Sequence, residues 1–509
     1  MISRLSLRSS ILIILAVFLG VVAVTWVGFL ASDDATYARG AYGWIEDFPY
    51  VGGHGTIRIT ITIPVALSFL AFGGSEFALI LPSLLYCLCL VALLIYAVWR
   101  MAGREAMLMM APLLVTLPVL VSSASVASVD VIEALFVVAS FQCFLIAGER
   151  EKRLWWLLGA GGLAAFGFLT RETTVFLLVY YGLLFLMGAV IERRQYWIMA
   201  GGFFAVWLQE ILYLTIMTGD PLYRMNISSH HDSTIDRTID LAGNVIVHPV
   251  VDPLLVILLN QEFTILFWVA IPVLAWYFLS GRKVAMGSPQ VRYLAGLWLG
   301  LAATWFVMVG AATTLLPLNP RYFLVTALAV LPSLAVAYSA LCRVGRHKAV
   351  GLLLMAAVSL NLAALYIENR NYIFGVEQFA AWTDAADAPV HADAETIRRA
   401  MILLKWSGAG DKASVAEAQA GELVFVDPAR TPHLLEQARA ENWPLVSKAH
   451  PAPKPLVPAI KDSRIWNFLP ARLRHNLDGG YGYVYLYRRG AGCSLTEMSD
   501  PSQEKCDNP

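Results

Sequence analysis

The chain has 509 residues, of which 58% are hydrophobic and only 15% are charged, and its formal net charge at pH 7 is zero. An ordinary soluble domain has about 25% charged residues, so this composition excludes that class, and a disordered chain would need the opposite composition. The balanced charge provides no basic surface, so nucleic acid is not an expected partner. The class that remains is a membrane protein with many spans.

Apolar segments long enough to cross about 30 Å of hydrocarbon recur through the first two thirds of the chain. We predict about eleven transmembrane helices, near residues 11–31, 77–99, 106–121, 129–147, 154–170, 174–191, 197–218, 263–280, 293–316, 321–341 and 349–367. The first segment follows Arg4 and Arg8, as a signal peptide would. It is longer than the apolar region of such a peptide, about 7–15 residues, and lacks a clear cleavage site, so we expect an uncleaved anchor.

Lysine and arginine are concentrated in alternate loops. One set of short loops contains Arg4, Arg8, Arg100, Arg104, Arg150, Lys152, Arg153, Arg193, Arg194, Arg282, Lys283, Arg292, Arg343, Arg346 and Lys348. The other set is longer and contains only Arg39, Arg58, Arg171, Arg224, Arg237 and Arg321. Because positively charged loops remain in the cytoplasm, we expect a multi-pass protein of the inner (plasma) membrane with a cytoplasmic N-terminus and a periplasmic C-terminal domain.

The composition changes after Leu365, where Ala, Asp, Glu, Pro and Arg replace the apolar runs. We predict a transmembrane domain over residues 1–367, with outer loops 32–76 and 219–262, and a soluble exoplasmic domain over residues 368–509. In the second domain, residues 422–427 are expected to form a buried strand, 431–441 a helix and 481–487 an aromatic strand. The predicted fold class is a polytopic α-helical membrane protein with a C-terminal soluble α/β domain, and this domain shows no catalytic signature.

The six cysteines divide by compartment. Cys87, Cys89, Cys143 and Cys342 lie in or at apolar spans, where cysteine serves as a small hydrophobic residue. Cys493 and Cys506 lie in the outer tail, where oxidation allows a disulfide. No spacing of Cys or His indicates a structural zinc.

Ionisable residues at membrane depth are costly, so their positions carry functional information. Nearly all of them lie at the outer ends of the predicted spans: Asp33, Asp34, His54, Arg58, Asp130, Glu133, Arg171, Glu172 and Arg321, with His230, His231 and Asp232 in loop 219–262. The cytoplasmic loops are short and rich in basic residues, which the orientation explains. An active site is therefore expected to face outward at the membrane surface.

Asp33 and Asp34 follow Ser32 directly after the first span. One interpretation is a helix N-cap with solvated acids, because Asp is favoured at such positions. The alternative is a carboxylate pair at the lipid–water boundary. In that pair one acid acts as a base and the other holds an acceptor hydroxyl or a cation.

His54 and Arg58 lie in a glycine-containing segment, where a ligand can approach the backbone closely. The two side chains are either solvated or bind an anion together. Residues 57–63 alternate between isoleucine and polar side chains, which predicts a strand. A single strand at a membrane surface would leave its edges unpaired.

Asp130 and Glu133 are three residues apart, on one face of a helix that is expected to begin near Ser128. They are either interfacial acids stabilised by the helix dipole or members of the site. Arg171 and Glu172 form a polar hinge between two spans, a self-neutralising pair, or a site in which Arg171 reaches a lipid phosphate, for which its planar guanidinium is suited.

Two further groups of polar residues have no clear role. His230, His231 and Asp232 lack recognisable metal-ligand spacing, so we interpret them as a solvated loop. Glu210 is the one acid truly within a predicted span, and packing and functional interpretations remain open for it.

This set of residues limits the chemistry that the site can perform. Hydrolysis or transfer of an ordinary glycoside needs one carboxyl group for the leaving oxygen and a second for the attacking group. A sugar phosphate already has a good leaving group, so it needs one base and a cation for the departing phosphate. Outer acids and neighbouring arginines meet this demand, and no metal is required, although adjacent acids could bind a divalent cation.

Several segments resemble, in order, the membrane-embedded glycosyltransferases of the GT-C class. The match is with the family-39-like branch that includes protein O-mannosyltransferases and lipid A aminoarabinose transferases. The matching segments are Asp33-Asp34-Ala35-Thr36-Tyr37-Ala38, residues 72–83 (FGGSEFALILPS), Asp130, Leu169-Thr170-Arg171-Glu172, and Pro320-Arg321-Tyr322-Phe323-Leu324 with Pro332. They extend over essentially the whole membrane part, and the ordered set is more specific than any single motif.

The resemblance implies an inverting transfer from a polyprenyl-phosphate sugar, with Asp33 as the base or acceptor holder and with Arg171, Arg58 and Arg321 at the lipid phosphate. It also implies interfacial helices in the first outer loop, contrary to the strand at 57–63. The basic-Pro-Pro segment of the family is replaced by His54-Gly55-Thr56, so His54 is the expected substitute.

We therefore predict a hexosyl- or pentosyltransferase in which Asp33, Asp34 and Asp130 are catalytic. His54, Arg58, Glu133, Arg171, Glu172 and Arg321 are expected to bind substrate, and no metal is assigned. An outward site has no access to cytoplasmic nucleotide sugars, which independently favours a lipid-linked donor. The acceptor is a lipid, a glycan or a protein.

Two alternatives to a transferase remain at this point. A glycolipid transporter or flippase without transferase activity would typically show repeated halves and ionisable groups near the midplane, and this chain shows neither apart from Glu210. A non-catalytic scaffold would leave the outer acids and arginines without a role.

Overall fold

The computed structural model describes residues 6–230, 248, 251–280, 288–312, 318–368 and 370–490. The chain divides into two compact units, Met1–Glu368 and Asn369–Pro509. Unit 1 is helical, and unit 2 combines helices with a small sheet. The predicted fold class, a polytopic helical membrane protein with an α/β domain, is confirmed. His231, Asp232, Cys493 and Cys506 lie outside the described residues.

The helices of unit 1 follow one another with short connections. They are α1 (Leu7–Val24), α2 (Asp33–Glu46), α3 (Ile59–Phe72), α4 (Glu76–Thr116), α5 (Pro118–Ala124), α6 (Val129–Glu149), α7 (Leu154–Thr170), η2 (Glu172–Thr174), α8 (Val175–Met187), α9 (Arg193–Thr218), α10 (Tyr223–His230), α11 (Val251–Leu259), α12 (Leu266–Leu279), α13 (Pro289–Ala311), η3 (Pro320–Phe323), α14 (Leu324–Arg343) and α15 (His347–Ile367).

Seven of the described helical segments are long and apolar enough to cross a membrane, and four shorter apolar helices accompany them. The 41-residue α4 contains two of the predicted spans, 77–99 and 106–121, up to Thr116. The helix is interrupted at Gly103, whose φ of 80° is readily adopted only by glycine. Residues 118–124 then form the separate short helix α5.

The prediction of a strand at residues 57–63 is wrong, because α3 begins at Ile59 and continues to Phe72. Ile61, Val65 and Phe69 recur every four residues and are buried, so the apolar pattern continues with helical spacing beyond the alternating stretch. A helix also satisfies its own backbone groups, which an isolated strand beside lipid cannot do. The resemblance implied helices in this loop, and α2 and α3 are present there; their location at the membrane surface stays a prediction.

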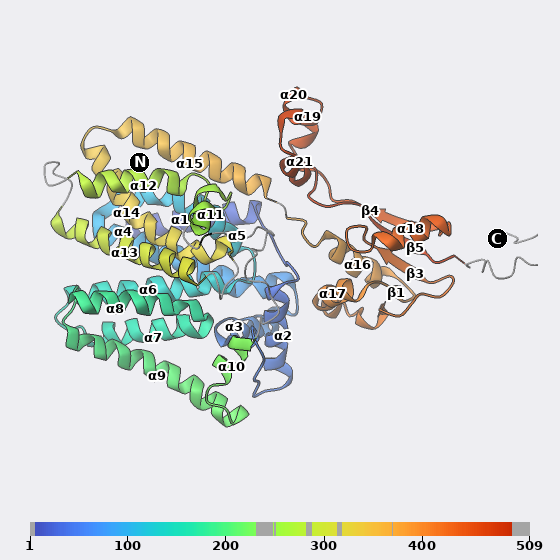
Figure 1. The fold of residues 1–509 in the computed structure, drawn as a ribbon, viewed down its shortest axis with the longest axis horizontal. Coiled ribbons are helices and arrows are strands. Elements are labelled where there is room, and N and C mark those ends of the chain that lie inside the picture. The colour runs from blue at the N-terminus through green and yellow to red at the C-terminus, as the bar shows by residue number, and fades with distance from the viewer. Residues whose placement is uncertain are drawn as a thin grey trace, which may run out of the picture. The chain divides into compact units, whose positions relative to one another are not determined.

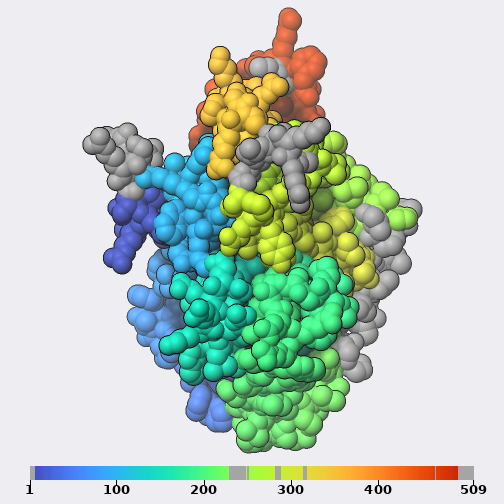
Figure 2. Space-filling view, turned by 90° about the vertical axis from the view of Figure 1, so that its left-hand side faces the viewer, coloured from blue at the N-terminus to red at the C-terminus, as the bar shows by residue number. Residues whose placement is uncertain are grey.

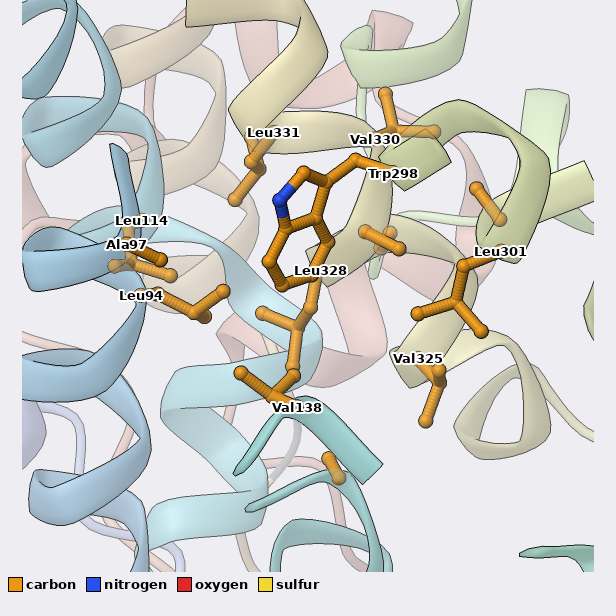
Figure 3. Close-up of a cluster of buried hydrophobic side chains, with 14 of the residues drawn as sticks. Leu94, Ala97, Leu114, Val138, Trp298, Leu301, Val325, Leu328, Val330 and Leu331 are labelled. Carbon is orange, nitrogen blue, oxygen red and sulfur yellow. The ribbon is translucent and has the colours of Figure 1, made fainter. Parts of the chain in front are cut away.

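A central apolar core holds the longest helices together (Figure 3). Trp298 of α13 is 1% exposed and lies among Leu114 of α4, Val138 of α6, and Leu328 and Leu331 of α14. α14 is buried along almost its whole length, more completely than any other described span. This packing fixes α14, which follows the turn η3 that contains Arg321.

The two ends of unit 1 carry different elements. The connections at residues 150–153, 188–192 and 344–346 lie at one end, and α2 and α3 lie at the other (Figure 1). We call the second end the outer end, because the sequence predicts that its loops face away from the cytoplasm. In the space-filling view, α6–α9 form one continuous teal and green side of the unit (Figure 2).

Unit 2 contains a five-stranded sheet with the order β2-β1-β3-β5-β4. The strands are β1 (Val390–His391), β2 (Ala413–Ser414), β3 (Leu423–Val426), β4 (Leu445–Ala449) and β5 (Val484–Arg488). β1 is parallel to β2 and β3, whereas β5 is antiparallel to β3 and β4.

The helices of unit 2 are α16 (Phe374–Ala385), α17 (Ala394–Ser407), α18 (Pro432–Ala440), α19 (Val457–Lys461), α20 (Arg464–Phe468) and α21 (Ala471–Leu477), with the 3-10 turn η4 (Gly410–Lys412). The strand predicted at 422–427 corresponds to β3 and the helix predicted at 431–441 to α18. The late aromatic strand is β5, which begins three residues after the predicted start.

Candidate active site

The two acids at the start of α2 have different environments. Asp34 is 3% exposed, and its carboxylate accepts hydrogen bonds from the backbone N–H groups of Ser32 and Ala35 at 2.7 and 2.9 Å and also from that of Leu30. Burial raises the pKa of Asp34 despite these hydrogen bonds. The side chain of Asp33 is 48% exposed. Asp34 therefore fixes the turn into α2, and Asp33 is the accessible acid of the pair.

Asp33 forms an ion pair with an arginine that is distant in sequence. Arg321 Nη1 lies 2.8 Å from Asp33 Oδ2, and Asn319 caps η3 by accepting the Arg321 N–H at 3.0 Å. Burial raises the pKa of Asp33, but Arg321, and then Arg58 and Arg171, outweigh burial and hold the pKa below its ordinary value. Asp33 is thus ionised at neutral pH, with Arg321 in direct contact and with Arg58 and Arg171 near enough for their charges to lower its pKa.

Arg171 is the second arginine of this group, at the C-terminal end of α7. It forms an ion pair with Asp130 in the first turn of α6, and both side chains are buried. Its guanidinium carbon lies 4.2 Å from the ring centroid of Tyr322, and that of Arg321 lies 5.6 Å from the same centroid. The electron-rich ring face attracts both cations, so Tyr322 holds the two arginines near each other.

Arg58 is the third arginine, directly before α3. Its Nη1 donates a hydrogen bond of 3.0 Å to the hydroxyl oxygen of Tyr37, which is buried four residues after Asp33 on α2. Burial raises the pKa of Tyr37 to about 12. The phenol therefore stays protonated and serves as a neutral acceptor that orients Arg58.

Glu133 lies one helical turn after Asp130 and is 3% exposed. Its Oε1 accepts hydrogen bonds from the hydroxyl groups of Thr173 and Thr174 at 2.6 and 3.0 Å. These bonds join α6 to η2, the turn that follows Arg171. These hydrogen bonds show that Glu133 stabilises this turn. A contact between Glu133 and substrate stays a prediction.

A second charged network adjoins this turn. Arg224 of α10 binds Glu210 of α9 through Nε and Nη2 at 2.6–3.0 Å, and its Nη1 lies 2.9 Å from Glu172. Its Nη2 also donates to the carbonyl of Leu169 at 3.1 Å. The side chains of Arg224 and Glu210 are each 4% exposed. We call Arg224, Glu210 and Glu172 the buried triad; it connects α9 and α10 to the end of α7.

Two glutamates that the sequence did not single out also lie near the site. Glu262 precedes α12, and its carbonyl accepts the N–H of Val119 at 3.2 Å, whereas Glu368 accepts a 2.6 Å hydrogen bond from Ser122 of the same short helix. Burial raises the pKa of Glu262 to about 7, and the nearby carboxylates of Glu368 and Asp130 contribute to this. Neither residue stands out in the sequence, because both lie at the edges of apolar runs.

An apolar cavity of about 250 Å³ lies next to the segment that contains Arg58. Its lining residues come from the first outer loop, α3, α7 and α9: Trp44, Tyr50, Val51, Gly52, Thr56, Ile57, Ile59, Ile63, Phe166, Leu169, Val206, Gln209, Glu210, Tyr213 and Leu214. Ile57 and Ile59 flank Arg58 in sequence, and Glu210 belongs to the buried triad. The cavity is therefore lined directly by one charged residue of the buried triad and by the two sequence neighbours of Arg58.

The structure brings most of the predicted site residues together. Asp33, Arg58, Asp130, Arg171 and Arg321 converge, and Glu133 and Glu172 support the turn beside Arg171. His54 lies partly buried in the turn before α3, four residues from Arg58, and its substitution for the family's basic residue stays a prediction. Among the described residues, no group of three or more His, Cys, Asp or Glu is arranged to hold a metal ion.

The role of Arg224 and its pairing with Glu210 were missed in the sequence. A usable signal was present, because Glu210 lies within an apolar span and a charge buried there requires a partner. Arg224 was one of only a few arginines in the outer loops. Glu210 and Arg224 are 14 residues apart and lie on different helices, so no local sequence pattern indicates that they pair.

Comparisons with known proteins agree on the class of fold. A family model described as dolichyl-phosphate-mannose-protein mannosyltransferase matches residues 64–216, and no curated protein matches the chain. The solved structure of ArnT from Cupriavidus metallidurans bound to undecaprenyl phosphate is 14% identical and covers 84% of this chain and 95% of that chain, with a TM-score of 0.57. An oligosaccharyltransferase from Archaeoglobus fulgidus is 12% identical over 83% of this chain and 70% of its own, with a TM-score of 0.53. The chain has the GT-C fold that its ordered motifs predict.

Proposed function

We propose that this protein is a glycosyltransferase that moves a sugar from a polyprenyl-phosphate donor to an acceptor at the outer membrane face. The observation that carries the proposal is the convergence of one accessible carboxylate, Asp33, with Arg58, Arg171 and Arg321. The matching family model is named for a dolichyl-phosphate mannose donor, and the ArnT structure holds undecaprenyl phosphate. Both names support a lipid phosphate as the leaving group.

The proposed reaction is a single displacement with inversion. The acceptor oxygen attacks the anomeric carbon of the sugar and forms the new glycosidic bond, while the bond from that carbon to the phosphate oxygen breaks. The electron pair of this bond leaves with the polyprenyl phosphate, whose added charge is stabilised by the three guanidinium groups. The proton of the acceptor hydroxyl passes to the ionised carboxylate of Asp33; a phosphate acceptor would need no such transfer.

Donor binding would release Asp33 for this task. Arg321 holds Asp33 in the ligand-free pair, and both side chains are partly exposed. The phosphodiester of the donor carries the same single charge as the carboxylate and matches the guanidinium in bidentate geometry, and its negative charge increases as the bond to the sugar breaks. When Arg321 moves to the phosphate, Asp33 is left to accept a proton, so the base becomes available only with the donor in place.

The other predicted catalytic acids act through their neighbours in this proposal. Asp130 holds Arg171 in a buried ion pair, so it positions an arginine that binds the donor phosphate. Asp34 uses its carboxylate to cap backbone N–H groups at the start of α2, so it positions Asp33. The apolar cavity next to the segment that contains Arg58 is suited to part of a hydrocarbon chain whose phosphate lies on the arginines.

The cellular setting and substrates complete the proposal. The protein would lie in the inner (plasma) membrane with its N-terminus in the cytoplasm and unit 2 in the periplasm, as the distribution of Lys and Arg indicates. The transferred group is a hexosyl or pentosyl residue, and the acceptor is a lipid, a glycan or a protein. No metal is assigned to the reaction.

The proposal is tested by mass spectrometry of envelope glycolipids and glycoproteins from cells with and without the protein, followed by transfer assays on purified protein. We expect a mass difference of one sugar, and Asp33→Asn should reduce transfer by about 10²–10⁴-fold, the usual contribution of a general base. Asp47→Asn is the matched control, because Asp47 is an exposed acid at the other end of α2.

Two results would contradict the proposal in different ways. Full turnover by Asp33→Asn would remove Asp33 as the base but keep the transferase. Glycolipid movement across vesicles by the wild type, with no mass change in any acceptor, would instead establish the flippase alternative.

A further inference from the structure

Unit 2 contains a segment that stands apart from its sheet. Residues 456–478, between β4 and β5, include the three short helices α19, α20 and α21, which lie together beyond the strands (Figure 1). The Lys454 N–H donates to the Leu477 carbonyl at 2.9 Å, and Lys461 Nζ lies 2.9 Å from Asp478. Val457 is fully buried. The segment is therefore closed at its base and has a preformed shape.

Large apolar side chains project outward from this segment. Phe468 at the end of α20 is 85% exposed, and Leu456 is 61% exposed although the adjacent Val457 is buried. A single exposed apolar residue needs no explanation. Phe468 is nevertheless the most exposed large hydrophobic residue of the described chain, and it sits on a helix that also carries Trp466.

The same segment is basic. It contains four Lys or Arg against two Asp, a formal excess of two positive charges. Arg464 and Arg472 are exposed, and among the described residues neither takes part in an ion pair, whereas Lys461 is paired with Asp478. Arg464 begins the helix that ends at Phe468. Unpaired cations thus flank an exposed aromatic ring within a few residues.

We propose that the 456–478 segment docks on an anionic lipid bilayer. Phe468 and Leu456 would enter the headgroup boundary, and Arg464 and Arg472 would bind lipid phosphates, the arrangement that interfacial anchors of peripheral proteins use. Lipid is favoured over a separate protein or glycan because unit 2 follows membrane-spanning helices in the same chain, which keeps its effective concentration near a bilayer high. The inference goes beyond the proposed transferase reaction and needs no catalysis to be tested.

The test compares hydrogen–deuterium exchange of the full chain in nanodiscs of phosphatidylcholine with and without phosphatidylglycerol. We expect amide exchange in residues 456–478 to slow by about tenfold in the anionic discs, because each basic residue near such a surface contributes appreciably to binding. High salt should reverse most of this protection by screening the charges. The triple variant Phe468→Ser, Arg464→Gln, Arg472→Gln should show no lipid-dependent protection.

A matched control separates this effect from a general change in charge. The variant Val415→Ser, Arg439→Gln, Arg488→Gln removes one apolar and two basic exposed side chains elsewhere in unit 2, and it should keep the protection. Equal protection in both lipids and in detergent would overturn the proposal, because the segment would then be covered by the protein itself. Protection that appears only after another protein is added would overturn it as well.

Discussion

Two arginine-centred clusters at the outer end of unit 1 differ in their access to solvent. In one, the side chains of Arg321 and Asp33 are 37% and 48% exposed. In the other, the buried triad, Arg224 and Glu210 are each 4% exposed and Glu172 is 30% exposed. Both clusters adjoin Arg171, which precedes Glu172 in the chain and contacts the ring of Tyr322.

Because of this difference, a ligand can separate Arg321 from Asp33, but it cannot separate the residues of the buried triad. An exposed ion pair contributes little to stability because water competes for both partners, so a phosphate can take Arg321 from Asp33 at small cost. Opening the buried triad would leave carboxylates unpaired in a dry environment. We infer that the Asp33–Arg321 pair belongs to the reaction and that the buried triad holds the scaffold around it.

The largest expected effect comes from breaking the buried triad. Arg224→Met should lower the free energy of unfolding by about 3–5 kcal/mol, because the buried carboxylate of Glu210 loses its partner. Thermal unfolding of the purified protein in detergent would measure the loss. Activity should fall as well, since the end of α7 that carries Arg171 loses a hydrogen bond from Arg224 to the Leu169 carbonyl.

Arg194→Met is the matched control for this prediction. Arg194 also forms a short ion pair, 2.6 Å from Glu192, but its side chain is 82% exposed. Its loss should change the free energy of unfolding by less than about 1 kcal/mol. If the two variants unfolded at the same temperature, burial would not be what distinguishes the clusters.

The opposite result is expected for the accessible pair. Arg321→Gln should reduce transfer by about 10²–10³-fold, the usual effect of removing one group that stabilises developing charge, while thermal unfolding stays close to that of the wild type. Arg39→Gln is the control, because Arg39 is an exposed arginine on α2 whose guanidinium donates a hydrogen bond to Thr36 in the same helix. A large loss of stability in Arg321→Gln with normal turnover would reverse the roles assigned to the two clusters.

Much of the site could be predicted from the sequence because topology places it. Once alternate loops are assigned to one side, the ends of the spans that carry Asp33, Asp130, Arg171 and Arg321 must lie at the same end of the bundle. Charges are costly in an apolar span, so the few that remain there identify the site. Convergence therefore follows from hydropathy and loop charge, without any knowledge of packing.

The division of labour within the site could not be predicted in the same way. Asp33 and Asp34 are adjacent and chemically identical, and only the path of residues 30–35 turns one toward the backbone and the other toward Arg321. Arg224 and Glu210 meet because α10 folds back on α9, which no periodicity indicates. The prediction of a strand at 57–63 was wrong because it rested on a short alternating pattern. The apolar residues that continue to Phe72 have helical spacing instead.

The smallest expected effect is the pH dependence of the accessible pair. The folded-state pKa of Asp33 lies below its ordinary value, so its contribution to stability is present above the unfolded-state pKa, about 3.9, and is lost as the pH falls through the folded-state value. The stability difference between wild type and Asp33→Asn should be below about 1 kcal/mol at neutral pH because the pair is half exposed, and it should vanish on acidification. Unfolding midpoints of both proteins across acidic pH would measure it. A difference that grew as the pH fell would mean that Asp33 is stabilised in its protonated form, which would contradict its ion pair with Arg321.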